Sequence, residues 1–265
     1  MSAYVATSAA AYERSMGRWS RRLADVMLDA LALPRGAAIL DLGAGTGALA
    51  EAIARRDPTA RITGIDLSEP FLAEARRRVP GATFRTGDMT ALDLPEAAFD
   101  AVLSLLVLQF VPDRAAAARE MARVAKPGGL VATTMWDFTG GFPFLRAFAD
   151  TIAATEPDGE AFRARYWSDP VGSPGRLSAL LAGAGLLDVA ERDIAIRQDF
   201  ASFADWWDPW AAGGQGIAGA YVATLPPDRL PRVEALARRA YLAGAPDGPR
   251  SFVAVARLAT GRRGA

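Results

Sequence analysis

The first half of the chain alternates short apolar runs with stretches of helical periodicity. A helical stripe of Trp19, Leu23, Met27 and Leu31 comes first and ends before Pro34-Arg35-Gly36. Short apolar runs follow it, and they predict buried strands at 38–42, 61–65, 82–85, 99–105 and 130–135. Amphipathic helical segments separate these strands, an alternation typical of βαβ units with a parallel sheet.

The second half is less periodic. Its regular segments are a helix near 175–181, a strand near 187–196, a helix near 228–242 and a final strand at 252–258. No internal repeat or low-complexity linker divides the chain. We therefore expect an α/β fold with a seven-stranded, mostly parallel sheet and helices on both faces. We further expect one domain over 1–265, with helical lid insertions near 138–172 and 202–248.

Composition and charge narrow the class of protein. The 265 residues are 51% hydrophobic and carry 30 basic and 30 acidic side chains, so no net positive field attracts a nucleic-acid backbone. Residues 1–14 lack the apolar core of a secretory signal, and the longest apolar region, 101–111, is too short to span a membrane. We expect a cytoplasmic protein, a monomer or homodimer, with no nucleic acid or membrane as partner.

The chain contains no cysteine and no histidine. This excludes disulfides, thiolate nucleophiles, imidazole bases and the metal sites that use these ligands, so we expect no metal. Any chemistry must use carboxylates, tyrosine, arginine, the single lysine Lys126, backbone dipoles or a cofactor.

A glycine-rich turn after the first strand is the most informative segment. It reads Asp41-Leu42-Gly43-Ala44-Gly45-Thr46-Gly47 and leads into a helix, whose first N–H groups are unpaired. With Ala48 it also fits the dinucleotide pattern G-x-G-x-x-A, and Asp66 lies at the right distance to bind a ribose. However, Asp41 beside the turn would repel a pyrophosphate, whereas it suits a ligand that carries positive charge.

The turn resembles motif I of the class I S-adenosylmethionine-dependent methyltransferases. Further segments match that family in the correct order, and together they cover about residues 12–137. The opening segment, residues 12–20, looks like the N-terminal helix of the small-molecule branch related to the ubiquinone and menaquinone methyltransferases. The other matching segments are Ile62-Thr63-Gly64-Ile65-Asp66-Leu67-Ser68, Gly87-Asp88-Met89, Phe99-Asp100-Ala101-Val102-Leu103-Ser104 and Lys126-Pro127-Gly128-Gly129.

The resemblance implies a Rossmann-like sheet and roles for individual residues. Asp66 would hold both ribose hydroxyls, Asp88 would accept from the adenine amino group, and Met89 would pack on the ring. Arg18 either binds the methionine carboxylate or lies solvated on a helix face, and Glu13 is expected at the surface. The full set of expected cofactor residues is Asp41, Gly43, Ala44, Gly45, Gly47, Asp66, Leu67, Gly87, Asp88, Met89, Ser104 and Arg18.

Aromatic residues are concentrated in the second half, where Trp136 and the residues after it hold 16 of the 23 aromatics. In the resembling architecture the lid insertions would overhang the sulfonium, so these rings predict an apolar pocket that excludes water. An ordinary core under long loops is the alternative. Gln109, where the family often has histidine, either orients the substrate or caps a turn. The candidate pocket residues are Gln109, Trp136, Phe142 and Trp207.

The expected function is transfer of a methyl group from S-adenosylmethionine to a small, apolar or aromatic molecule by in-line displacement. Positioning supplies most of such catalysis, so no dedicated base is required. If a base exists, Asp137, Tyr12 and Tyr166 are the candidates. The alternatives are an NAD-dependent oxidoreductase and a protein that binds S-adenosylmethionine without transferring its methyl group.

Overall fold

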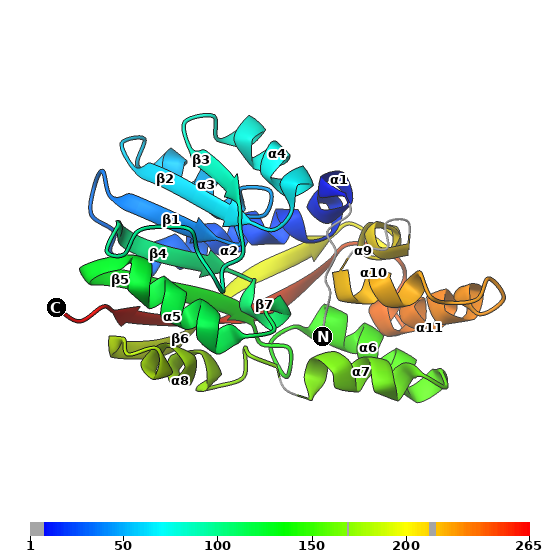
Figure 1. The fold of residues 1–265 in the computed structure, drawn as a ribbon. Helices are drawn as coiled ribbons and strands as arrows, with labels where there is room; N and C mark the ends of the chain where they lie inside the picture. The colour runs from blue at the N-terminus through cyan, green and yellow to red at the C-terminus, as the bar shows by residue number, and fades with distance from the viewer. Residues whose placement is uncertain (1–7, 169, 212–215) are drawn as a thin grey trace.

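The computed structural model of the chain describes residues 8–168, 170–211 and 216–265. Seven strands form one sheet in the order β3-β2-β1-β4-β5-β7-β6 (Figure 1). β1 to β5 pair in parallel, and β7 lies antiparallel to both β5 and β6. The strands are β1 (Ala38–Leu42), β2 (Arg61–Asp66), β3 (Thr83–Thr86), β4 (Phe99–Leu105), β5 (Ala125–Trp136), β6 (Leu187–Phe200) and β7 (Arg250–Arg262). The expected seven-stranded, mostly parallel sheet is confirmed.

Helices cover both faces of the sheet (Figure 1). One face carries α2 (Arg18–Asp29), α3 (Ala48–Arg56) and α4 (Glu69–Arg78), and the other carries α5 (Arg114–Val124) and α8 (Arg176–Gly183). The predicted stripe of α2 is buried at Trp19, Leu23 and Met27, whereas Leu31 lies beyond the end of the helix. The buried apolar side chains of the helices on both faces form one core with those of the central strands.

Three strands, β5, β6 and β7, extend well beyond their predicted ranges. β5 begins at Ala125, because Ala125 pairs with Phe99 before the register shifts to Leu130 beside Ala101. The segment Lys126-Pro127-Gly128-Gly129 therefore bulges within the strand. β6 and β7 extend further than predicted and form a long antiparallel ribbon.

The segments after β5 and β6 are helical. α6 (Pro143–Thr155) and α7 (Gly159–Trp167) follow β5, and α9 (Phe203–Ala211), α10 (Gly216–Val222) and α11 (Leu230–Leu242) lie between β6 and β7. These five helices gather at one end of the sheet, at the right of Figure 1. At the start of the described chain, α1 (Ala9–Tyr12) and a π-helical turn (Glu13–Gly17) lead into α2. Within the described residues, no helix is long and apolar enough to cross a membrane.

Candidate active site

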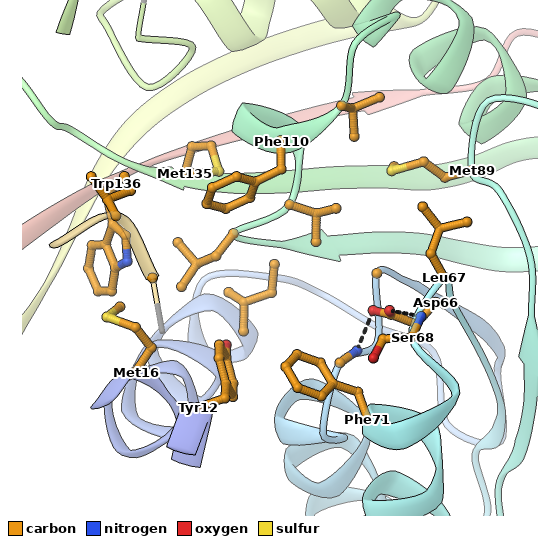
Figure 2. A pocket seen from close by; sticks show the side chains of 18 of the residues that line it. Tyr12, Met16, Asp66, Leu67, Ser68, Phe71, Met89, Phe110, Met135 and Trp136 are labelled. Atoms are coloured by element: carbon orange, nitrogen blue, oxygen red, sulfur yellow. Dashed lines mark hydrogen bonds between the residues drawn. The ribbon is translucent and has the colours of Figure 1, made fainter. Parts of the chain in front are cut away.

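One cavity of about 950 Å³ opens along the carboxyl ends of the parallel strands. Its wall takes residues from the ends of β1, β2, β3, β4 and β5, from the N-terminal helix, and from α6 and α10 (Figure 2). This edge is where open α/β sheets bind ligands. The cavity extends from the glycine-rich turn to a cluster of aromatic rings.

The three glycines of the turn have different surroundings. Gly43, Gly45 and Gly47 all have positive φ, of +71°, +54° and +88°. A Cβ on Gly43 would overlap the Val107 side chain, and one on Gly47 would lie 3.1 Å from the Cα of Ala75. A Cβ on Gly45, in contrast, would meet nothing closer than 3.9 Å. Gly45 lines the cavity, so a side chain there would occupy ligand space rather than the core.

Asp66 ends β2 and lines the cavity next to this turn. Its Oδ2 accepts a hydrogen bond from the Gly45 N–H at 2.9 Å, and its Oδ1 accepts from the Ser68 N–H at 2.8 Å. Burial raises the pKa of Asp66, although these backbone donors oppose the shift. The two hydrogen bonds fix the carboxylate and leave each oxygen a second lone pair for a ligand.

Asp41 lies behind the cavity wall rather than in it. Its side chain is buried, and Oδ2 has no hydrogen-bond partner among the described residues. Burial, followed by the nearby charge of Asp66, raises the pKa of Asp41 to about 7. A cation near this turn would favour the ionised form.

The segment after β3 lines the same end of the cavity. Asp88 Oδ1 accepts hydrogen bonds from both the N–H and the hydroxyl of Thr90, each at 2.8 Å. Met89 is buried, and Leu67 is 71% exposed and also lines the cavity. The sequence motifs therefore bring seven of the expected cofactor residues to one wall: Gly43, Gly45, Asp66, Leu67, Gly87, Asp88 and Met89.

The N-terminal helix forms another wall, which includes Tyr12 and Met16 (Figure 2). The Tyr12 ring lies 5.0 Å from the Phe71 ring, and its hydroxyl is 3.0 Å from that of Ser20. Burial raises the pKa of Tyr12, so this phenol is a poorer proton acceptor at neutral pH than its ordinary pKa would make it.

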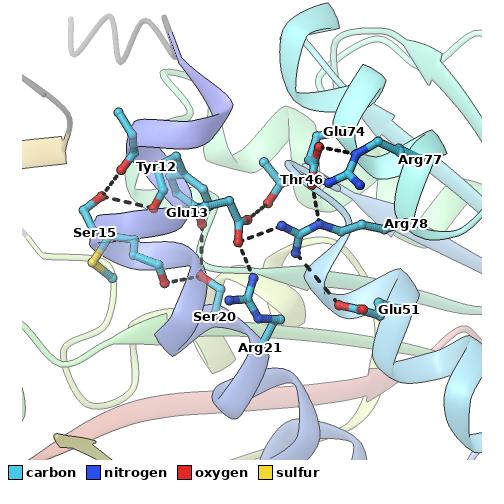
Figure 3. Close-up of polar contacts among 12 residues, drawn as sticks. Tyr12, Glu13, Ser15, Ser20, Arg21, Thr46, Glu51, Glu74, Arg77 and Arg78 are labelled. Atoms are coloured by element: carbon cyan, nitrogen blue, oxygen red, sulfur yellow. Dashed lines mark hydrogen bonds and ion pairs between the residues drawn. The ribbon is translucent and has the colours of Figure 1, made fainter. Parts of the chain in front are cut away.

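Glu13 joins this helix to the glycine-rich turn (Figure 3). Its carboxylate accepts hydrogen bonds from the hydroxyl of Thr46 and from Arg21, and it pairs with Arg78 of α4 at 2.8 Å. Burial alone would raise the pKa of Glu13, but these three donors outweigh it and the pKa is lowered. The expected surface position of Glu13 is wrong, because its partners come from segments distant in the sequence.

The other end of the cavity is apolar. Trp136 stacks on Phe142 with ring centroids 4.8 Å apart, and Phe142 lies 4.6 Å from Phe144. The remaining apolar lining residues here include Met16, Leu105, Leu106, Val107, Phe110, Met135, Phe138, Leu145, Trp210 and Ile217. None of the described residues that line the cavity is lysine or arginine. The aromatic excess pointed to Trp136 and Phe142, but no sequence signal identified Met16 or Phe110.

Two of the four candidate pocket residues lie outside the cavity lining. Trp207 packs inside the helical segment, stacked with Phe203 at 5.9 Å and 6.2 Å from the Phe148 ring. Gln109 is buried, and its Oε1 accepts from the Val171 N–H at 2.9 Å. Gln109 thus holds the loop at Val171 in place. This contact is closer to the expected turn-capping role than to a role in orienting the substrate.

Several other candidate residues also make contacts away from the cavity lining. Arg18 pairs with Asp205 at 2.9 Å, and Asp137 caps the turn at Thr139 and Gly140. The Ser104 hydroxyl donates to the Leu42 carbonyl. The expected residues that do not line the cavity are Asp41, Ala44, Gly47, Ser104, Arg18, Gln109, Trp207, Asp137 and Tyr166.

The sequence matches known methyltransferases. The family model for a methyltransferase domain matches residues 40–133. The chain is 34% identical to a trans-aconitate 2-methyltransferase of Variovorax paradoxus, over 62% of this chain and only 59% of that protein. It is 33% identical to a demethylmenaquinone methyltransferase of Beutenbergia cavernae, over 63% of this chain and 72% of that protein. It is 30% identical to the nocamycin O-methyltransferase of Saccharothrix syringae, over 95% of this chain and 94% of that protein.

The fold matches as well. Phosphoethanolamine N-methyltransferase 2 of Haemonchus contortus, solved with S-adenosyl-L-methionine, superposes with a TM-score of 0.61 at 17% identity, covering 99% of this chain and 58% of that one. The chain belongs to the class I S-adenosylmethionine-dependent methyltransferases. Membership of this family indicates S-adenosylmethionine as the cofactor and speaks against the alternative NAD-dependent oxidoreductase.

Proposed function

We propose that the protein methylates a small, uncharged, apolar or aromatic molecule bound at the aromatic end of the cavity. The observation that carries this proposal is the continuity of one cavity from Gly45 and Asp66 to Trp136 and Phe142. A single cavity can hold the cofactor at one end and present its methyl group to a second molecule at the other. The lack of lysine and arginine in the described lining supports an uncharged acceptor.

We assign the polar end to the cofactor. Asp66, oriented by its two backbone donors, accepts hydrogen bonds from the ribose hydroxyls. Asp88 accepts from the adenine amino group, and Leu67 and Met89 cover the ring. The backbone of Gly45 lies against the methionine portion, and the negative charge of Asp41 behind it stabilises the cationic groups.

The apolar end binds the acceptor and excludes water. The cofactor supplies a methyl group already activated by the sulfonium, so the chain's main contribution is to hold the acceptor in line. No histidine exists to remove a proton, and Tyr12, a candidate base that lines the cavity, has a raised pKa. The acceptor is therefore one whose nucleophilic hydroxyl is acidic enough to release its proton to bulk water, without a strong protein base, as the methyl group is transferred.

The chemistry of the relatives helps to select the acceptor class. trans-Aconitate is a tricarboxylate, and recognition of three carboxylates calls for cationic side chains. The described lining instead contains four acidic residues, Asp66, Glu69, Asp88 and Asp113. The nocamycin O-methyltransferase, which matches over nearly the full length of this chain, is named for transfer to oxygen, and this name supports an oxygen nucleophile.

The helical segments near 138–172 and 202–248 are proposed as lids of a single domain over residues 1–265. α6 and α10 contribute cavity-lining residues, including Phe144, Leu145, Ile217 and Ala218. A small molecule is the proposed partner, and the protein is proposed to act in the cytoplasm as a monomer or homodimer.

The test is methyl transfer from S-adenosylmethionine carrying a labelled methyl group. The acceptor panel contains neutral phenols and enols of one to three rings, with trans-aconitate as the anionic comparison. We expect labelled product with neutral ring compounds and none with trans-aconitate. Methylation of trans-aconitate without any neutral product would contradict the proposed acceptor class. Mass spectrometry of molecules that co-purify with the protein extends the panel.

A further inference from the structure

Trp136 brings one polar group to the apolar end of the cavity. The indole lines the cavity, and the residue is 2% exposed. Figure 2 shows the ring on the wall, with its nitrogen on the side that faces Phe110 and Tyr12. The indole N–H has no hydrogen-bond partner among the described residues.

A buried indole N–H normally donates a hydrogen bond, because an unpaired donor loses its bond to water without replacement. Rotation of Trp136 toward another partner is restricted. Its backbone pairs with Ala256 across β5 and β7, and its ring stacks on Phe142 at 4.8 Å. The donor is thus fixed at the cavity wall and shielded from bulk water.

Among the described residues of the neighbouring wall, the hydroxyls of Tyr12 and Ser15 bond to Ser20 and to backbone carbonyls of the same helix, and neither pairs with this donor. The side chains that surround the apolar end are those of Met16, Leu106, Phe110, Met135, Phe138 and Phe142. A ligand atom that accepts a hydrogen bond would therefore satisfy the N–H without water in competition. The indole nitrogen cannot accept a hydrogen bond from the ligand, because it acts only as a donor.

We propose that Trp136 determines acceptor specificity by donating its indole N–H to an oxygen of the acceptor. The inference rests on the proposed function, since it requires the acceptor to occupy the apolar end. It narrows the acceptor class to apolar ring compounds that carry an oxygen with an accessible lone pair, such as a ring ketone, at the edge of the skeleton. A pure hydrocarbon of the same shape leaves the donor unpaired and binds more weakly.

The test uses two matched probes, the aromatic ketone 1-tetralone and its hydrocarbon counterpart tetralin. Each is titrated into the ¹⁵N-labelled protein saturated with S-adenosylhomocysteine, and the indole N–H signals of the six tryptophans are recorded. Trp136→Phe, which keeps an aromatic ring and removes the donor, identifies the signal of Trp136. Trp206→Phe is the control, because its indole N–H is also unpartnered but Trp206 does not line the cavity.

We expect 1-tetralone to move the Trp136 indole proton downfield and to bind about three- to ten-fold more tightly than tetralin. In Trp136→Phe this preference should fall to about one-fold, whereas Trp206→Phe should retain it. Equal binding of the two probes with no downfield shift of the Trp136 signal would overturn the inference and leave the apolar acceptor end standing. If neither probe binds, the proposed acceptor end is itself contradicted.

Discussion

Glu13 accepts a hydrogen bond from the hydroxyl of Thr46, a residue 33 positions further along the chain. Through this contact the N-terminal helix, which lines the cavity, is attached to the glycine-rich turn. The same carboxylate pairs with Arg78 at the end of α4. One acidic side chain thus connects three segments that surround the proposed cofactor end.

Glu13→Gln tests this connection. The variant keeps a partner for Thr46 but removes the charge that faces Arg21 and Arg78, so the free energy of unfolding should fall by about 1–3 kcal/mol. We expect S-adenosylmethionine to bind several-fold more weakly, by calorimetry, because the wall and the turn are less firmly held. Glu74→Gln is the control, since Glu74 also pairs with Arg78, but its second partner is Arg77 rather than Thr46. Cofactor affinity equal to wild type in Glu13→Gln would show that the contact is structural only.

Asp41 should give the unliganded protein a characteristic pH dependence. Its pKa in the folded chain is about 7, compared with an ordinary value of 3.8. Between these values the folded state binds more protons than the unfolded state, so stability falls as pH rises from about 4 to about 7 and is level above that. The loss of stability is on the order of 4 kcal/mol, because each pKa unit corresponds to about 1.4 kcal/mol.

Thermal unfolding of wild type and Asp41→Asn between pH 5 and pH 8 isolates this contribution, because all other groups are shared. The stability of Asp41→Asn relative to wild type should rise with pH. A difference that stays constant over this range would mean that Asp41 does not titrate there.

Asp66→Ala should weaken the binding of S-adenosylmethionine by about ten-fold or more, since it removes charge-assisted hydrogen bonds to two ribose hydroxyls. Asp88→Ala should cost less, because it removes a single bond to the adenine amino group. Calorimetry measures both affinities, and circular dichroism checks that each variant is folded. An affinity of Asp66→Ala equal to wild type is incompatible with the ribose assignment.

Two glycines of the turn should respond differently to the same substitution. A side chain at Gly45 enters the cavity, so Gly45→Val should abolish cofactor binding; the φ of +54° also strains the valine, so the melting temperature should fall somewhat while the protein stays folded. A side chain at Gly43 overlaps Val107, so Gly43→Val should also lower the melting temperature strongly. Circular dichroism and calorimetry on the two variants distinguish these effects. Loss of the fold in Gly45→Val would assign that glycine to the turn rather than to the ligand.

Phe142 and Trp207 form a matched pair of aromatic substitutions, because only Phe142 lines the cavity. Phe142→Leu should raise the KM for the acceptor and change the dissociation constant of S-adenosylmethionine by less than about three-fold. Trp207→Leu should lower the melting temperature with a smaller effect on KM. If Phe142→Leu weakens the cofactor as much as the acceptor, the two ends of the cavity are not separate.

The strand ends were predictable from the sequence because their signals are local. An apolar run followed by Asp41 and Gly43, or closed by Asp66, defines both a buried strand and the sheet edge where it ends. Contacts between distant segments have no such local signal. Arg18 meets Asp205, which lies 187 residues away, and Glu13 meets Thr46 and Arg78 only after the helices have packed.

The roles of individual aromatic residues in the helical segments after β5 and β6 also could not be predicted from the sequence. Aromatic content predicted an apolar region after β5, but it could not separate cavity-lining rings from core rings. Phe142 and Trp207 are equally buried, and only their three-dimensional neighbours assign one to the cavity and the other to the core.

The most direct test of a single cavity with a cofactor end and an acceptor end is a crystal structure with S-adenosylhomocysteine. We predict that the ribose hydroxyls lie within hydrogen-bonding distance of Asp66 and that the adenine lies beside Met89. The sulfur should point toward the apolar end near Trp136, with that end still open. Adenosine bound among the aromatic rings, or a ribose turned away from Asp66, would contradict the account.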